Sequence, residues 1–114
     1  MVLTDIIDRG NLSADTRRAL LKSAADIPSD YDRRQVLTTY LQKLDVDASA
    51  RDAFFAAVDA MGSDYDRAET LVAFASRHPI DAATRPAFVA SAERLRSAYD
   101  QNRVLAALVK AERR

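Results

Sequence analysis

Cysteine and tryptophan are absent from this 114-residue sequence, and glycine and proline occur only two and three times. Without cysteine the chain can form no disulfide, no thiolate metal site and no thiol nucleophile. With 48% hydrophobic and 30% charged residues, this scarcity of glycine and proline is typical of a folded, helix-rich domain. Disordered and collagen-like chains are therefore excluded.

An excess of one charge is also absent, because 17 Lys and Arg residues balance 17 Asp and Glu residues. This balance argues against a nucleic-acid binder, which relies on a strong positive field. No apolar run approaches the roughly 18 residues that cross a bilayer, and the densest patch, residues 53–58, ends at Asp59. The first residues also lack the pattern of an export signal. We expect a soluble chain with no nucleic-acid partner and no membrane insertion, in a compartment that the sequence leaves open.

A period of 34 residues is the main signal in the sequence. The tetrapeptide Ser-Asp-Tyr-Asp at residues 29–32 returns at 63–66, and Ser-Ala-Tyr-Asp follows at 97–100. Arginine also returns at this spacing, and the register needs no gap. The sequence predicts one helical-repeat domain over residues 1–114, with units starting near residues 29, 63 and 97 after a partial first unit at 1–28.

Each unit has the pattern of two helices. In the second unit Val36, Leu37, Tyr40, Leu41 and Leu44 form one apolar stripe at helical spacing. A second helix follows behind an N-cap at position 47, which is matched by Ser13 and Asp81. We expect helices over residues 2–9 and 14–27, helix pairs over 30–61 and 64–95, and a last helix over 98–112. The predicted fold class is all-α, a right-handed α-solenoid of about three and a half units and about seven helices.

The helix ends carry capping signals. Ser29 is expected to accept a hydrogen bond from the backbone N–H of Asp32, while the Asp32 carboxylate reaches back to the Ser29 N–H. Asp30 adds negative charge at the positive end of the helix dipole. Gly62 is predicted to adopt the left-handed conformation of a C-cap.

The period and the paired helices distantly resemble tetratricopeptide and HEAT-like repeats, but the early Trp and the Leu-Gly-x-x-Tyr pattern of the former are missing. The Ser-Asp-Tyr-Asp start, followed by Val36 and Leu37, is more similar to the Ser-x-Tyr-Asp/Glu helical repeats attached to some bacterial membrane metallopeptidases of the β-lactam-sensor class. This resemblance covers nearly the whole chain. It implies a repeat segment of a larger bacterial protein, without the peptidase residues and without an activity to transfer.

The Asp-Tyr-Asp triplets place two carboxylates one residue apart, as in oxygen-ligand metal loops. The third copy has Ala98 in place of the first aspartate but keeps the serine and the later acid, which favours helix capping over a metal site. The tyrosine column is interpreted as a packing stack between units, with each hydroxyl bound to a polar partner, rather than as a ligand cage. These columns are Tyr31, Tyr65 and Tyr99, and Asp32, Asp66 and Asp100.

Arg17, Arg51 and Arg85 form a third column, and the helix dipole does not explain arginine near the start of a helix. The favoured interpretation is a ladder in which each guanidinium binds a carboxylate of the Asp32 column or a carbonyl at the junction of two units. The alternative is a row of cations about 10 Å apart that grips an acidic or extended peptide. Charge reversal at Arg51 or Arg85 would lower stability in the first case and abolish partner binding in the second.

No group of residues points to catalysis. His78 is the only histidine, so that neither a catalytic triad nor a zinc site can be assembled. Gly10 and Gly62 stand alone, so there is no glycine-rich phosphate loop. We expect no enzyme activity, no cofactor and no metal.

The predicted function is a non-enzymatic scaffold that binds a protein or peptide along a groove formed by adjacent units. The alternative is a structural spacer or self-assembly module. The last predicted helix has the apolar pattern of an interior helix, so either the chain is an excerpt of a longer array or it forms homo-oligomers through its terminal helices. A basic cluster near the C-terminus is interpreted as a solvated surface, with an acidic partner as the alternative. It consists of Arg94, Arg96, Arg103, Lys110, Arg113 and Arg114.

Overall fold

Seven helices and no strands make up residues 2–113, the part of the chain that this computed structural model describes. The predicted all-α class and the number of helices are therefore confirmed. The helices are α1 (Val2–Arg9), α2 (Ala14–Ala25), α3 (Asp30–Lys43), α4 (Ala48–Asp59), α5 (Asp64–Arg77), α6 (Arg85–Glu93) and α7 (Ala98–Glu112).

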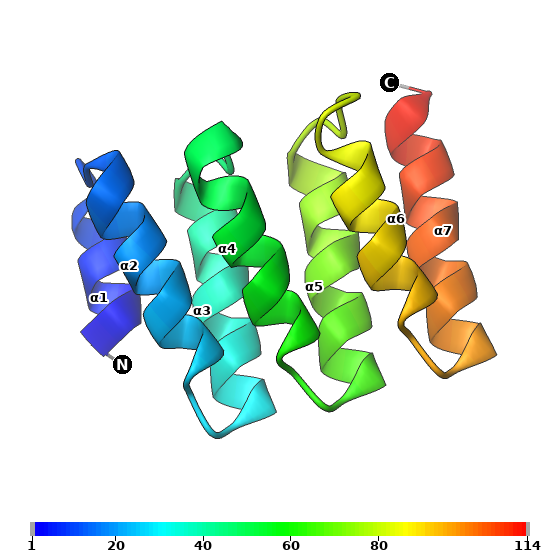
Figure 1. The fold of residues 1–114 in the computed structure, drawn as a ribbon, viewed down its shortest axis with the longest axis horizontal. Helices are drawn as coiled ribbons and strands as arrows, with labels where there is room; N and C mark the ends of the chain where they lie inside the picture. Colours follow the sequence, from blue (N-terminus) through cyan, green and yellow to red (C-terminus); the bar gives the residue numbers. More distant parts are fainter. Residues whose placement is uncertain (1, 114) are drawn as a thin grey trace.

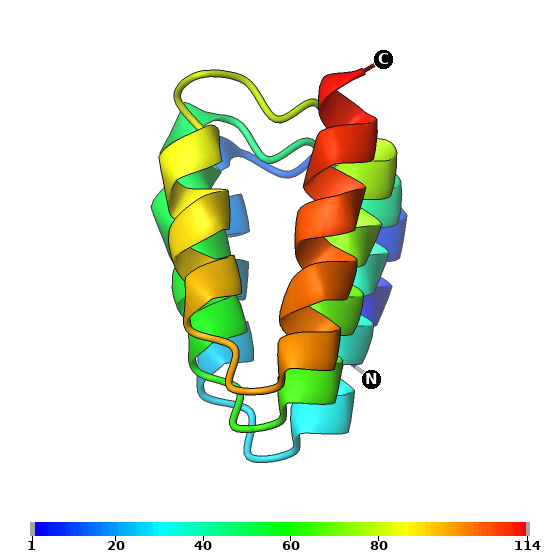
Figure 2. The same cartoon turned by 90° about the vertical axis from the view of Figure 1, so that its right-hand side faces the viewer.

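The helices lie in two layers (Figures 1 and 2). Helices α1, α3, α5 and α7 form one layer, which we call the A layer, and α2, α4 and α6 form the B layer. The molecule measures 35 × 29 × 18 Å, and its smallest dimension fits two stacked helices of about 10 Å diameter. Within the A layer each helix packs on the next, while in the B layer α2 packs closely on α4 and α6 more loosely.

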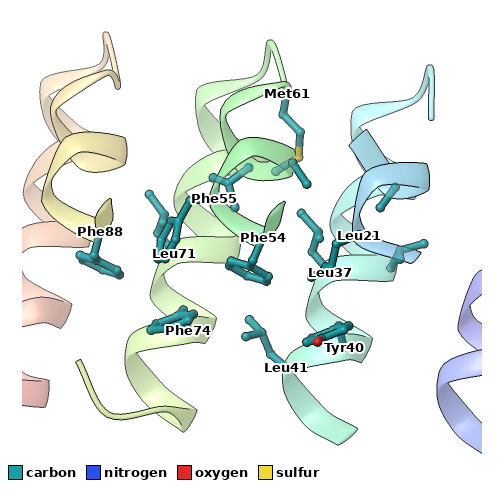
Figure 3. Packing of buried hydrophobic residues seen from close by; sticks show 14 of the residues in the cluster. Leu21, Leu37, Tyr40, Leu41, Phe54, Phe55, Met61, Leu71, Phe74 and Phe88 are labelled. Atoms are coloured by element: carbon teal, nitrogen blue, oxygen red, sulfur yellow. The ribbon is translucent and has the colours of Figure 1, made fainter. Parts of the chain in front are cut away.

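The core lies between the two layers and passes from unit to unit (Figure 3). Four buried rings alternate between A and B helices in the order Tyr40, Phe54, Phe74, Phe88, with centroids 6.4, 5.6 and 6.1 Å apart. Tyr40 and Phe74 occupy equivalent positions of the 34-residue period, as do Phe54 and Phe88. The helical stripes read from the sequence therefore meet in one continuous aromatic line.

Tyr40 gives this core a dependence on alkaline pH. Its ring is fully buried and its hydroxyl donates to the Asp45 carbonyl over 3.5 Å. Burial, which disfavours the phenolate, raises the pKa of Tyr40 from 10.0 to about 12. Because the folded state holds the proton more tightly than the unfolded state, the contribution to stability is complete below about pH 10 and is lost as the pH rises to 12.

We expect the free energy of unfolding of the wild type, measured by urea denaturation, to fall between pH 10 and 12 more steeply than that of Tyr40→Phe. The phenylalanine variant keeps the ring and removes the titrating group, so it controls for alkaline effects on the rest of the chain. Parallel pH profiles of stability for the two proteins would contradict a raised pKa of Tyr40 as the cause.

The B helices differ from the predicted ranges at their ends. Helices α2 and α4 end two residues before the predicted ends at 27 and 61. Helix α6 spans Arg85–Glu93, although its predicted N-cap is Asp81 and its predicted end is residue 95. Pro86 explains the late start, since it has no N–H to continue the helical hydrogen bonds. The preceding residues form a turn, in which the Thr84 N–H donates to the Asp81 carboxylate at 2.8 Å.

Gly62 does not adopt the predicted left-handed conformation. Among residues 2–113, positive φ angles occur only at Gly10 (70°) and Asn11 (55°), where α1 ends as the sequence indicates. A Cβ atom on Gly62 would lie 3.7 Å from the nearest Asp30 oxygen, an ordinary contact. The position therefore has no need of glycine, in agreement with Pro28 and Arg96 at the equivalent places.

Candidate peptide-binding surface

Three tyrosines lie in register at one edge of the A layer, because α3, α5 and α7 begin at the same point of the period. The predicted serine caps set these starts and are confirmed. The hydroxyl oxygens of Ser29, Ser63 and Ser97 each accept from the backbone N–H three residues later, at 3.2 Å in all three helices. Tyrosine is the second residue of each helix, so the caps fix its position.

The tyrosine side chains remain exposed, with 58, 57 and 74% of Tyr31, Tyr65 and Tyr99 accessible. Their rings are bridged by arginines rather than stacked on each other. The Arg34 guanidinium lies 5.3 Å from the Tyr31 centroid and 5.6 Å from that of Tyr65, and Arg103 lies 5.9 Å from both Tyr65 and Tyr99. We call these five residues the tyrosine row. Contrary to the prediction, the three hydroxyls have no hydrogen-bond partner within the described range.

Carboxylates hold the two arginines between the rings. The Arg34 Nε donates to an Asp66 oxygen at 2.6 Å. Arg103 donates to Glu69 at 2.7 Å and to Asp100 at 3.4 Å. The hydrogen bond with Glu69 is the main cause that raises the pKa of Arg103 above its ordinary value. Carboxylates of the chain itself therefore hold both cations in place.

The 34-residue period does not reveal the two arginines of the tyrosine row. Arg34 reaches forward from α3 and Arg103 reaches back from α7, and the two do not occupy equivalent positions of the unit. The missed signal was the spacing from each tyrosine, which is three residues to Arg34 and four to Arg103. Both spacings place a side chain on the tyrosine's face of its helix.

The predicted capping box is only half formed, because the Asp32 carboxylate has no bond to the Ser29 N–H. The first aspartate of the motif instead joins adjacent units. Asp30 Oδ2 accepts from the backbone N–H groups of Gly62 and Ser63 at 3.1 and 2.9 Å. Asp64 Oδ2 accepts in the same way at 2.8 and 2.6 Å, from Arg96 and Ser97. We call this repeated contact the aspartate clamp.

The arginine column predicted as a ladder lies at the opposite edge of the molecule, where the B helices begin. Each of its members contacts the following unit, but none binds Asp32, Asp66 or Asp100, so the predicted carboxylate partners are wrong. Arg17 lies 3.9 Å from Asp47, Arg51 donates to Thr84 at 3.2 Å, and Arg85 donates to Glu112 at 2.7 Å.

Asp47, the N-cap of α4, has its pKa lowered chiefly by a hydrogen bond from Ser49. Asp81 has its pKa lowered by hydrogen bonds from Thr84. Asp47 is therefore engaged at the start of α4, as predicted. Asp81, also predicted as an N-cap, is instead engaged in the turn before α6, whose N-cap is Thr84. The arginine column is thus a set of contacts between units, and its use as a partner-binding row stays a prediction.

His78 lies half-buried at the end of α5 and links two A helices. Its Nε2 is 2.8 Å from the Leu41 carbonyl oxygen of α3, and its ring packs on Phe74 at 5.5 Å. Within residues 2–113, no three His, Cys, Asp or Glu side chains form a group that could hold a metal ion.

A groove on the outer side of the A layer begins at the tyrosine row and runs between α5 and α7. Arg103 belongs both to the row and to the wall of this groove. Two adjoining hollows of about 440 and 370 Å³ make up the groove. We call it the α5–α7 groove; it is lined by Val72, Ala75, Ser76, Arg103, Ala106, Ala107, Val109, Lys110, Ala111 and Arg113.

A second groove, of about 710 Å³, lies between α2 and α4 on the B layer. Alanines form most of its floor, and its charged residues have both signs: Arg18 and Lys22 on α2, Asp26 after it and Asp52 on α4. No aromatic side chain lines it. This groove therefore has no counterpart of the tyrosine row.

Comparison with known proteins finds no matching family model, no similar curated protein and no similar solved structure. None of the described helices is long and apolar enough to cross a bilayer.

Proposed function

We propose that this chain is a non-enzymatic helical-repeat scaffold that binds a protein or peptide on the outer surface of its A layer. We also infer that the seven helices form an α-solenoid. The packing of each A helix on the next and the aromatic line through successive units support that inference. The right-handed sense of the solenoid stays a prediction.

The tyrosine row is the observation that carries the binding proposal. Tyr and Arg, together with Trp, are enriched in the energetic centres of protein interfaces. The three rings keep more than half of their surface exposed, so their contribution to the core is small. Their arginines are already ordered by carboxylates, which reduces the entropy that a partner must remove on binding.

The test is selection from a displayed library of random peptides, with the whole chain as the target. We expect enriched peptides whose affinity falls roughly tenfold or more for Tyr65→Ala, because loss of an interface tyrosine often exceeds 1.4 kcal/mol. Lys22→Ala on the B layer is the matched surface control and should leave affinity unchanged. Circular dichroism checks that both variants stay folded. A library that yields no peptide, or peptides indifferent to Tyr65, would refute the proposal.

Self-association is the second candidate, and one observation favours it. Val109 on α7 is 49% exposed, whereas its equivalents Leu41 and Ala75 are only 3 and 2% exposed. A further helix placed there would cover this side chain as it covers the other two. Sedimentation velocity separates this function from peptide binding, since only self-association makes the sedimentation coefficient rise with concentration.

A further inference from the structure

The α5–α7 groove carries charge of one sign. Three cations line it, Arg103, Lys110 and Arg113, and no carboxylate does. Arg103 is neutralised by Glu69 and Asp100. Lys110 and Arg113 form no ion pair with any residue that the structure describes. The groove therefore presents two uncompensated positive charges on its α7 side.

The floor of the groove is apolar and shallow. Val72 on α5 and Ala106, Ala107 and Val109 on α7 line it, with Val109 half exposed. Because alanine projects only a methyl group, the backbone of a bound segment can approach the two helices closely. A groove between two helices runs along their axes, and a third helix packs in such a groove at an interaxial distance of about 8–10 Å.

The corresponding surface between α3 and α5 lacks the cationic wall. Its α5 side stays apolar, since Val72, Ala73 and Ala75 lie one period before Ala106, Ala107 and Val109. One period before Arg103, Lys110 and Arg113, however, the residues are Glu69, Ser76 and Pro79. The row of three cations beside an apolar floor therefore belongs to the α5–α7 groove.

We propose that the α5–α7 groove binds an acidic amphipathic helix of a partner protein. This inference rests on the proposed function and names the ligand class. Apolar side chains at helical spacing i, i+4 and i+7 pack on the floor. Carboxylates beside this stripe pair with Lys110 and Arg113, while Tyr65 and Tyr99 cover the end of the helix that reaches the tyrosine row. A helix with a basic polar face would be repelled by the same wall.

The test uses a displayed library of 15-residue peptides with leucine fixed at the stripe positions and Glu, Lys, Gln or Ser at the others. We expect the selected peptides to carry Glu beside the stripe and to bind more weakly as salt increases. The double variant Lys110→Glu/Arg113→Glu should weaken a selected acidic peptide by tenfold or more in fluorescence anisotropy. Gln42→Glu, which adds one negative charge at the equivalent place on α3, is the matched control and should change the affinity by less than twofold.

Each outcome separates this inference from the proposed function. The proposal of an acidic helix would be overturned if the selected peptides were basic or uncharged. It would be overturned equally if acidic peptides bound the double charge-reversal variant as tightly as the wild type. The acidic-helix proposal would also be overturned if the helix library yielded no peptide while the random library yielded peptides that depend on Tyr65. Failure of both libraries would remove the proposed function as well. A melting temperature of the double variant close to that of the wild type shows that a lost affinity is not a lost fold.

Discussion

Phe74→Ala is expected to lower the free energy of unfolding by about 3–5 kcal/mol, the largest effect among the substitutions considered. The Phe74 side chain is 1% exposed and contacts rings from two B helices. Its centroid lies 5.6 and 5.4 Å from those of Phe54 and Phe55 on α4, and 6.1 Å from that of Phe88 on α6. Truncation therefore opens a cavity at the point where the aromatic line crosses from one unit to the next.

Urea denaturation followed by circular dichroism measures this loss. Phe74→Leu keeps most of the apolar volume and should lose about half as much or less, which separates the cavity from the general effect of replacing a residue in the core. A loss below about 1 kcal/mol for Phe74→Ala would contradict the position of this ring at the centre of the core.

Asp64→Ala is expected to lower the free energy of unfolding by about 2 kcal/mol. The Asp64 carboxylate accepts two backbone N–H groups of the loop before α7, at 2.8 Å from Arg96 and 2.6 Å from Ser97. Alanine leaves both donors without their acceptor, and the Ser97 bond is partly buried. Asp64 is also the first residue of α5, so a few tenths of a kcal/mol of the loss comes from the lost interaction of its negative charge with the helix dipole.

The chain offers a matched control for this local effect. Ala98→Asp places the same carboxylate at the same helix position of α7, and the 114-residue chain used for this measurement contains no equivalents of residues 96 and 97 for it to bind. We expect its stability to change by less than about 0.5 kcal/mol. Asp64→Asn, which keeps one acceptor oxygen, should fall between the wild type and alanine. If the alanine and asparagine variants both matched the wild type in urea denaturation, the aspartate clamp would not hold adjacent units together.

The helical content was predictable because its causes are local. The apolar stripe through Val36, Leu37 and Tyr40 predicted α3, and serine at position 29 marked its start. The late start of α6 was also open to prediction, since Pro86 interrupts the helical hydrogen bonds. A strict 34-residue period predicts an earlier start because it takes no account of this proline.

The contacts between units were not predictable in the same way. Asp30 was assigned to the dipole of its own helix, yet its carboxylate binds backbone groups 32 and 33 residues later in the sequence. Spacing alone cannot say which atoms of a distant loop meet a side chain. The sequence did single out the three tyrosines, but the arginines between them depend on the width of the gap between helices, which only the folded chain defines.

The aspartate clamp has a consequence for how such a chain can change in length. Its donors are main-chain amides, which every residue type except proline supplies, and its acceptor arrives once per period. A duplicated stretch of 34 residues would thus bring along the acceptor needed by the next copy, whatever its other side chains. Growth by whole copies keeps this bond at every new joint, whereas the insertion of a few residues would displace acceptor from donor. The aspartate clamp therefore favours elongation by whole 34-residue copies, and it leaves the residues at outward-facing positions free to diverge.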